Sequence, residues 1–520
     1  MNMMEDNTSM IFNQLPISLE DMDMKEIKPV AALKLLPYFF LKQHCIFPVE
    51  EDKMTITFLS KDPLNFSAFD EVKLILDKEV KIKAASAERI FELISNFYNK
   101  NQGEASQFIA DLQEEENLQG EAFSREGDLL DIQDVSPTVR LLNLILKEAI
   151  IERASDIHFE STGDALRVRY RIDGVLHNRH APSLDYQAAL LTRIKVMAKL
   201  NVAEHRLPQD GRIKLKMGGR DIDFRVSIVP NVSGERIVLR ILDKENIILG
   251  LDQLGMDIGV LKQFKKLLKC SEGIILVTGP TGSGKTTTLY SSLCDIVSDS
   301  LNIMTIEDPV EYKVNGVAQM AVHPKIGLTF STGLRHLLRQ DPDILMVGEI
   351  RDKETAEIAI QAALTGHLVL STLHTNDAPS TILRLIDMGI EPYLLSSTII
   401  GVLAQRLVRK ICPNCKKKVI PTVEEKDFLD KCNNQLSFLY EGSGCPDCLF
   451  SGYKYRHGIY ELLIVDSDLK TVISSSKDIK LLQKTAEKRN FKNLLQHGLE
   501  LVAQGTTTLS EVLRVISKID

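Results

Sequence analysis

The segment from Gly279 to Thr286 has the composition and spacing of a phosphate-binding loop. It is GPTGSGKT and matches the pattern G-x-x-x-x-G-K-[ST] in full. Glycines let backbone N–H groups curl around phosphates, the lysine reaches the β and γ oxygens, and a hydroxyl at Thr286 suits Mg²⁺. An apolar strand-like run precedes the loop and a helical sequence follows it, as this motif requires. The predicted nucleotide-binding residues are Gly279, Pro280, Thr281, Gly282, Ser283, Gly284, Lys285, Thr286 and Thr287.

Glu349 is the candidate for activating water, because it closely follows the apolar run Ile344 to Val347. Short continuous apolar runs predict parallel strands buried on both faces, and ligands bind at the carboxyl ends of such strands. A carboxylate at that place can orient or deprotonate the attacking water. Gly348 stands where an aspartate usually holds Mg²⁺, so more of the metal coordination is expected to come from Thr286 and water.

A second acidic group follows another strand-like run, in the segment TIEDPVEY. Pro309 ends the run and turns Glu307, Asp308 and Glu311 outward. We expect Glu307 to face the phosphate site and to assist catalysis. The alternative for all three carboxylates is a solvated turn.

Two histidines, His367 and His374, flank the apolar run LVLSTL. A histidine beside a core strand is often a structural residue, but two around one strand near a nucleotide suggest a sensor of the γ-phosphate. We assign that role to His374 and leave the role of His367 open.

Four of the eight cysteines form two C-x2-C pairs, Cys412 with Cys415 and Cys445 with Cys448, separated by 29 residues. Each pair presents two thiolates, and two pairs close a tetrahedral zinc site with no open coordination position. We therefore predict a structural Zn²⁺ site. The alternative is a redox pair, which the presence of two similar pairs disfavours.

The chain has 520 residues, a formal net charge of −8 and 44% hydrophobic residues. This composition indicates a globular protein of several domains and argues against binding through an overall basic surface. Residues 101–135 hold ten acidic residues and one basic residue, which predicts a solvated linker. Neither a signal peptide nor a membrane-spanning run is visible, so a cytoplasmic location is expected.

Local patterns predict elements on both sides of this linker. Residues 36–50 are predicted as a helix that leads into strands of a small α/β unit. A strand is predicted at Leu166 to Ile172, where apolar residues alternate with arginines that would form a basic outer face. Near the C-terminus, Thr508 and Glu511 fit a capping box at the start of a helix.

Four segments together resemble the type II secretion and type IV pilus assembly ATPases, and fit the type II secretion ATPase family best. They are GPTGSGKTTTLY, TIEDPVEY, LRQDPDILMVGEIRD and TGHLVLSTLHTNDA. These look like the family's Walker A motif, Asp box, atypical Walker B motif and His box. The resemblance is strong over about residues 136–520 and looser over the first 100.

This resemblance implies an α/β fold with a RecA-like P-loop core and an α+β, PAS-like second N-terminal domain. It also implies a small N-terminal α/β domain and a Cys₄ zinc insert with a helical C-terminus. The expected parts are 1–100 (docking domain), 101–135 (acidic linker), 136–247 (regulatory domain), 248–408 (ATPase core), 409–452 (zinc insert) and 453–520 (helical subdomain).

The same resemblance implies a homohexameric ATPase with ATP, Mg²⁺ and Zn²⁺ as ligands, peripheral to the cytoplasmic face of the inner membrane. Its expected partners are the secretion platform proteins of that membrane. The N-terminal domain would dock on the cytoplasmic domain of a bitopic protein, and a polytopic protein would be the other partner. Motif matching assigns Arg225 and Arg240 to the ATP site, where guanidinium groups can neutralise charge developing on the γ-phosphoryl group.

Three other functions stay open at this point. A type IV pilus extension ATPase would use the same chemistry in another machine. A nucleic-acid or DNA-uptake motor is disfavoured because aromatic residues make up 6% of the chain and Trp is absent, and no nucleic-acid partner is expected. A non-enzymatic scaffold is disfavoured by the complete set of Lys285, Thr286 and Glu349.

Overall fold

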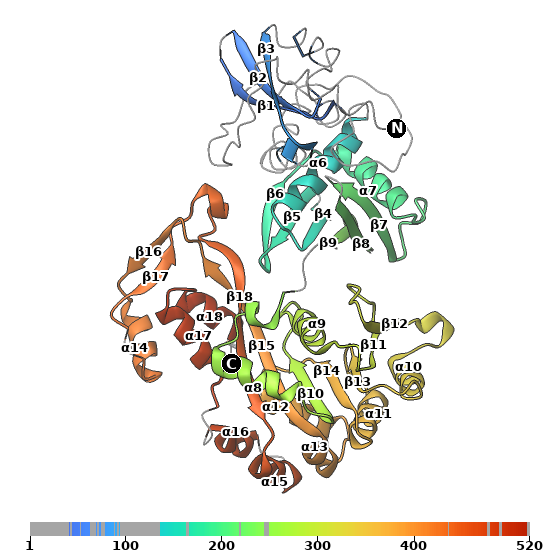
Figure 1. Cartoon of the computed structure of the whole chain (residues 1–520), viewed down its shortest axis with the longest axis vertical. Helices are drawn as coiled ribbons and strands as arrows, with labels where there is room; N and C mark the ends of the chain where they lie inside the picture. The colour runs from blue at the N-terminus through green and yellow to red at the C-terminus, as the bar shows by residue number, and fades with distance from the viewer. Residues whose placement is uncertain are drawn as a thin grey trace, which may run out of the picture. The chain divides into compact units, whose positions relative to one another are not determined.

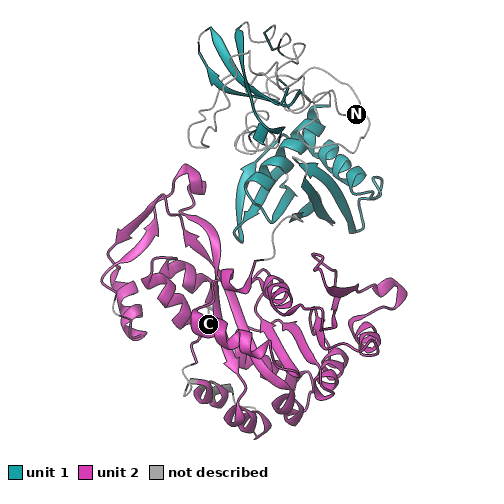
Figure 2. Cartoon of the chain, viewed as in Figure 1, with its two compact units in different colours: residues 1–245 teal, residues 246–520 magenta. Residues whose placement is uncertain are grey.

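The computed structural model describes parts of residues 41–93 and nearly all of 136–516. The gaps in the second stretch are 163–165, 218–219, 244–248, 435, 476–478 and 488–490. The predicted linker lies outside the described residues. The chain divides into two compact units, residues 1–245 and residues 246–520 (Figure 2). Among the described residues, no helix is both long enough and apolar enough to cross a membrane.

Three short strands make up most of what is described of the N-terminal region: β1 (Ile46–Glu51), β2 (Thr55–Ser60) and β3 (Glu79–Ala84). β2 lies between an antiparallel β1 and a parallel β3. The prediction of a helix over 36–50 is wrong at its C-terminal end, which forms β1. Pro48 lacks the N–H group that a helix interior needs, and as part of a strand its apolar neighbours are buried in a small core.

The rest of the first unit is an antiparallel sheet of six strands, in the order β6-β5-β4-β9-β8-β7 (Figure 1). Helices α6 (Pro137–Ile151) and α7 (Asp185–Met197) pack their apolar sides against one face of it. The strands are β4 (Asp156–Ser161), β5 (Leu166–Ile172), β6 (Val175–His180), β7 (Gln209–Met217), β8 (Arg220–Asn231) and β9 (Gly234–Asp243).

The two faces of this sheet differ in chemistry, as the alternation in β5 predicts. The alternate residues from Leu166 to Tyr170 are fully buried under the helices. Strand register sets Asp156 opposite Arg240 and Arg240 opposite Arg225, on β4, β9 and β8. Residues directly opposite each other share a face of the sheet. The face of the sheet away from α6 and α7 therefore carries a transverse row of charged side chains.

The second unit contains a sheet of seven strands in the order β12-β11-β13-β14-β10-β15-β18, in which only β18 is antiparallel to its neighbour. Its strands are β10 (Gly273–Thr278), β11 (Ile303–Glu307), β12 (Val317–Ala321), β13 (Ile344–Val347), β14 (Leu368–Leu373), β15 (Ile399–Ile411) and β18 (Tyr453–Ile464). Because the first six strands are parallel, the loops after them gather at one edge, where the site is built.

Helices cover both faces of this sheet (Figure 1). One core cluster joins α8 (Ile258–Leu267) and α9 (Lys285–Ile296) to the sheet, together with the short 3₁₀ turn Leu251–Gln253. The other cluster holds α10 (Phe330–Leu337), α11 (Lys353–Leu364), α12 (Ala378–Asp387) and α13 (Pro392–Thr398). Successive residues of β10 enter the two clusters alternately, as expected for a central buried strand.

Strand β15 continues beyond the parallel sheet into the cysteine-rich insert and the C-terminal helices. The insert holds β16 (Lys416–Val419), α14 (Val423–Lys431), β17 (Leu439–Gly442) and the 3₁₀ turn Pro446–Cys448. The tail holds α15 (Ser467–Ser475), α16 (Ile479–Glu487), α17 (Leu494–Ala503) and α18 (Leu509–Ile516).

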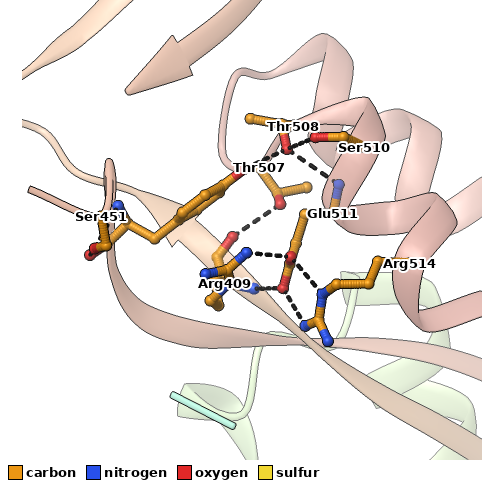
Figure 3. Close-up of polar contacts among 8 residues, drawn as sticks. Arg409, Ser451, Thr507, Thr508, Ser510, Glu511 and Arg514 are labelled. Carbon is orange, nitrogen blue, oxygen red and sulfur yellow. Dashed lines mark hydrogen bonds and ion pairs between the residues drawn. The ribbon is translucent and has the colours of Figure 1, made fainter. Parts of the chain in front are cut away.

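A buried ion-pair network ties α18 to β15 (Figure 3). Glu511 is 1% exposed, and its carboxylate accepts from Arg409 Nη2 at 2.9 Å and from Arg514 Nη2 at 2.6 Å. The predicted capping box is half present, because Thr508 Oγ1 accepts from the Glu511 N–H at 3.1 Å. The Glu511 carboxylate turns to Arg409 and Arg514 instead, where it accepts charge-assisted hydrogen bonds from both guanidinium groups in addition to one from the Arg409 backbone N–H.

Candidate nucleotide and metal sites

The phosphate loop joins the carboxyl end of β10 to the N-terminus of α9, as the sequence predicts. Gly284 precedes the helix with φ +89°, and Gly282 has φ +79°, so both occupy the left-handed region that favours glycine. A Cβ placed on Gly282 would meet no atom within 4 Å, which leaves open space beside the loop. Thr286 and Thr287 are exposed in the first turn of α9. An open loop at a helix N-terminus suits the phosphates of a nucleotide.

Lys285 folds back over this loop. Its Nζ donates to the carbonyl oxygens of Gly279 at 2.8 Å and Pro280 at 3.1 Å. Burial lowers the pKa of Lys285 to about 8, although the negative charge of Glu349 acts in the opposite direction. Phosphate oxygens near Nζ would favour the charged amine and raise this pKa again. The lysine is thus placed to respond to an anion.

Ser283 gives a second indication that the loop is built around a ligand. Its side chain is 3% exposed, and no described residue hydrogen-bonds its Oγ. Buried hydroxyls normally have a partner. An additional acceptor such as a phosphate oxygen fits this place.

Glu349 lies beside His374, and its charge acts on Lys285. Its Oε2 is 3.7 Å from His374 Nε2, and its Oε1 forms an ion pair with Arg351. The hydroxyl of Thr372 on β14 donates to the Gly348 carbonyl at 2.7 Å and fixes the backbone before Glu349. Burial and the charge of Lys285 lower the pKa of His374, which favours a neutral imidazole. A carboxylate, an imidazole and two cations therefore meet at the edge of the sheet.

Glu307 is buried at the end of β11 and does not form a solvated turn. It is 4% exposed, and its carboxylate accepts hydrogen bonds from Tyr290 on α9, from Thr305 Oγ1 at 2.7 Å and from Gln319 Nε2 at 3.0 Å. These contacts join α9, β11 and β12. The structure thus shows Glu307 as a link between elements around the site. Its neighbour Asp308 is exposed and acts electrostatically on Arg351.

The two histidines lie at opposite ends of β14 and have different surroundings. His374 follows the carboxyl end of β14 and lies beside Glu349, whereas His367 precedes the amino end of the same strand. His367 Nδ1 contacts the Ala362 carbonyl at 2.8 Å and Thr365 Oγ1 at 3.1 Å. These contacts close the end of α11, which gives His367 a structural role.

Arg225 and Arg240 belong to the first unit, where they face each other on β8 and β9. Arg240 Nε donates to Asp156 Oδ1 at 3.0 Å, and 56% of its side chain stays exposed. A partly exposed guanidinium held by one carboxylate keeps donor groups for a further anion. Only the pairing of β8 with β9 shows that the two arginines are neighbours, because 15 positions separate them in the sequence.

The four paired cysteines converge as predicted, with their Sγ atoms within 4.8 Å of one another. Cys412 and Cys445 are 3.8 Å apart, as are Cys415 and Cys448, and Cys445 and Cys448 are 3.7 Å apart, all measured between Sγ atoms. Tetrahedral Zn²⁺ with bonds of about 2.3 Å requires sulfur separations of about 3.8 Å, whereas a disulfide requires about 2.0 Å. The donor set therefore fits Zn²⁺.

Backbone groups also support a thiolate in this cluster. Burial raises the pKa of the Cys448 thiol, but N–H groups of Cys445 and Gly452, 3.2 and 3.3 Å from Sγ, bring it down to about 7. A thiolate is the form that binds metal.

Two polar residues at the site were missed in the sequence. Arg351 follows Glu349 by two positions, so the sequence alone could have indicated that it lies close to the Glu349 carboxylate. Gln405 is a buried polar residue in the apolar run IIGVLAQRLVRKI, and it hydrogen-bonds the phosphate loop at Ser283. That interruption was the signal in the sequence.

Comparison with known proteins identifies the family. Residues 131–514 match the family model described as type II/IV secretion system protein. The chain belongs to this family. Residues 14–104 match a second model, the MshEN domain, so the type II/IV secretion match is preceded by a separate domain.

Curated members of the type II/IV secretion family match this chain over nearly its full length. The type II secretion system ATPase E of Vibrio cholerae is 43% identical, over 93% of this chain and 97% of its own. The type II secretion system protein E of Pseudomonas aeruginosa is 44% identical, over 94% of this chain and 97% of its own. The type IV pilus assembly ATPase PilB of Myxococcus xanthus is 42% identical, over 96% of this chain and 88% of its own.

Solved structures confirm the expected RecA-like α/β core of a secretion ATPase. The pilus retraction motor PilT with bound ADP has a TM-score of 0.50 and 29% identity, and covers 73% of this chain and 97% of its own. The ATPase DotB of Legionella pneumophila has a TM-score of 0.54 and 21% identity, over 73% of this chain and 95% of its own, which shows the shared fold.

Proposed function

We propose that this protein is the ATPase motor of a type II secretion system, whose ATP hydrolysis drives pseudopilus assembly and protein export across the outer membrane. The observation that carries the proposal is the meeting of Lys285, Glu349 and His374 beside the phosphate loop. Similarity to type II secretion ATPases along nearly the whole chain supports the choice of machine.

In the proposed reaction, the loop and Lys285 hold the β- and γ-phosphates. Glu349 accepts a proton from water as the water oxygen attacks the γ-phosphorus, and ADP leaves. Arg351 holds one oxygen of Glu349, while the other faces His374, which is placed to sense the γ-phosphate. Glu307 assists by positioning α9 and β11, through the contacts described above.

The exposed hydroxyl of Thr286 would hold Mg²⁺. This ion supplies charge neutralisation at the β- and γ-phosphates when bound. The four cysteines would hold one structural Zn²⁺, since three of their sulfur separations, at 3.7 to 3.8 Å, match its tetrahedral geometry.

A Glu349→Gln variant tests the proposed reaction. Turnover should fall by about 10²- to 10⁴-fold, because the amide cannot accept the proton, while ADP affinity should stay near that of the wild type. Steady-state phosphate release measures the turnover, and titration with a fluorescent ADP analogue measures the ADP affinity. Glu357→Gln on α11 is a matched control, since Glu357 is an exposed carboxylate. Wild-type turnover in the Glu349 variant would remove Glu349 from the mechanism.

A type IV pilus motor is the second candidate, because PilB of Myxococcus xanthus is nearly as similar as the secretion ATPases. Co-purification of the full chain with membrane proteins separates the two. Recovery of a secretion platform protein supports the proposal, and recovery of pilus components alone supports the alternative.

We further propose that the protein forms a homohexamer at the cytoplasmic face of the inner membrane. The family resemblance also implies the six domain boundaries given above and the secretion platform proteins as partners. In the hexamer, Arg225 and Arg240 would complete the ATP site. Their adjacency on the face of the sheet away from α6 and α7 supports this role, because two guanidinium groups side by side suit a polyphosphate.

A further inference from the structure

Gln405 is a buried polar side chain beside the phosphate loop. Thr278 of β10 pairs with Ala404 of β15, so the next residues, Gly279 and Gln405, stand side by side where the loop begins. Gln405 is 1% exposed. A buried amide requires hydrogen-bond partners for both of its ends.

Both partners of the Gln405 amide belong to the phosphate loop and the helix after it. Its Nε2 donates to the Ser283 carbonyl at 2.7 Å, and its Oε1 accepts from Thr288 Oγ1 at 2.8 Å. The backbones also approach closely, since a Cβ on Gly279 would lie 2.5 Å from the Gln405 carbonyl oxygen. A Cβ on Gly284 would lie 3.2 Å from Gln405 Nε2. Two of the loop glycines are therefore packed directly on Gln405.

The contact with Ser283 fixes the direction of the next N–H group. The carbonyl of Ser283 and the N–H of Gly284 belong to one planar trans peptide, so they point in opposite directions. While Gln405 holds the carbonyl, the Gly284 N–H must point away from Gln405. Backbone N–H groups of such loops are the groups that bind phosphate.

We infer that Gln405 is a positioning residue for ATP, which holds the Ser283–Gly284 peptide so that its N–H is presented to a phosphate. Gln405 acts through the loop and does not itself touch the nucleotide. The inference rests on the proposed ATP site.

A Gln405→Met variant of the full chain tests this role, because methionine keeps the length of the side chain and removes both hydrogen bonds. The dissociation constant for ADP should rise by about 10- to 100-fold, the worth of one hydrogen bond to a charged group. Failure of the wild type to bind ADP would refute the proposed function itself. ADP binding by the wild type and an unchanged constant in the variant would refute only the role of Gln405.

A Thr288→Val variant is the matched control, because it removes the contact to Gln405 Oε1 and leaves the contact to Ser283. The circular dichroism spectra of both variants should resemble that of the wild type, while the ADP affinity of Thr288→Val stays within about twofold of the wild type. If both variants lose ADP affinity equally, the effect is one of packing, and the positioning role is wrong.

A Gln405→Glu variant provides a readout that a purely structural role would not produce. The neutral carboxyl group can donate to Ser283 as the amide does, whereas the carboxylate cannot. ADP affinity relative to the wild type should therefore be restored as the pH falls through the pKa of the new carboxyl group. A ratio of affinities that does not change with pH would overturn the inference.

Discussion

Replacing Glu511 by alanine should loosen α18 from β15, because this carboxylate holds the two elements together. It accepts from the Arg409 N–H at 3.0 Å and from Arg409 Nη2 at 2.9 Å. It also accepts from Arg514 Nε at 2.8 Å and Nη2 at 2.6 Å. The side chain of Glu511 is 1% exposed, and those of Arg409 and Arg514 are 16% and 47% exposed.

These exposed fractions decide how much stability each substitution should remove. Removing one member of a buried pair costs about 3 to 5 kcal/mol, because it leaves the other charge without compensation. Arg409 stays largely buried and bears that cost in Glu511→Ala. Arg514 is half-exposed and can be solvated, so Arg514→Ala should cost below about 1 kcal/mol.

Amide hydrogen exchange in the full chain is the assay, because a protein of several domains has no single unfolding transition. A loss of about 3 kcal/mol corresponds to a more than 100-fold loss of protection for the amides of α18. The Arg514→Ala control should change protection by less than about tenfold. Equal losses in the two variants, or protection in Glu511→Ala within tenfold of the wild type, would refute the reasoning.

The same network predicts a dependence on pH. Burial raises the pKa of the Glu511 carboxyl group, but hydrogen bonds from Arg514 and Arg409 outweigh burial and lower it. A lowered carboxyl pKa adds stability above the ordinary value of about 4.3, and that stability is lost as pH falls through the lowered value. Protection of α18 should therefore persist at pH 5 and fall in more acidic solution, with no such fall specific to α18 in Glu511→Ala.

Three further predictions concern the proposed sites. Lys285→Ala should abolish ATP turnover and weaken ADP binding without unfolding the core, as phosphate release, ADP titration and circular dichroism can show. Cys445→Ser should reduce bound zinc from about one per chain to below half by elemental analysis, whereas Cys270→Ser, at an exposed cysteine, should not. Arg240→Ala should lower turnover by at least about 100-fold with ADP affinity preserved, and Arg212→Ala, the residue opposite Arg225 on the same sheet, should retain turnover. An equal loss in both arginine variants would contradict the specific role of Arg240.

The parts of the site that are local in sequence were predictable. The phosphate loop lies within eight consecutive residues, and each cysteine pair needs only two residues between its members. Glu349 was found because an apolar run marks a buried strand and its carboxyl end marks the site. In these cases the chain itself sets the distance between the groups, so spacing is nearly equivalent to geometry.

Glu307 shows where this reasoning ends. It is the last residue of β11, at the same edge of the sheet as Glu349, yet its carboxylate turns toward Tyr290 and Gln319. A strand end fixes where the backbone arrives, but partners from other elements decide where the side chain points. The helix predicted over 36–50 fails for a related reason, since β1 exists through its pairing with β2.

Local spacing and periodicity in the sequence are enough to predict a phosphate-binding loop, four cysteines that suit one metal ion and a core built on a parallel α/β sheet. Tertiary structure alone decided that Arg225 lies opposite Arg240, that Glu511 binds Arg409 and that Gln405 holds the phosphate loop. Such pairs join residues that are distant in the chain. Strand register and helix packing bring them together, and neither can be derived from the spacing of the residues in the sequence.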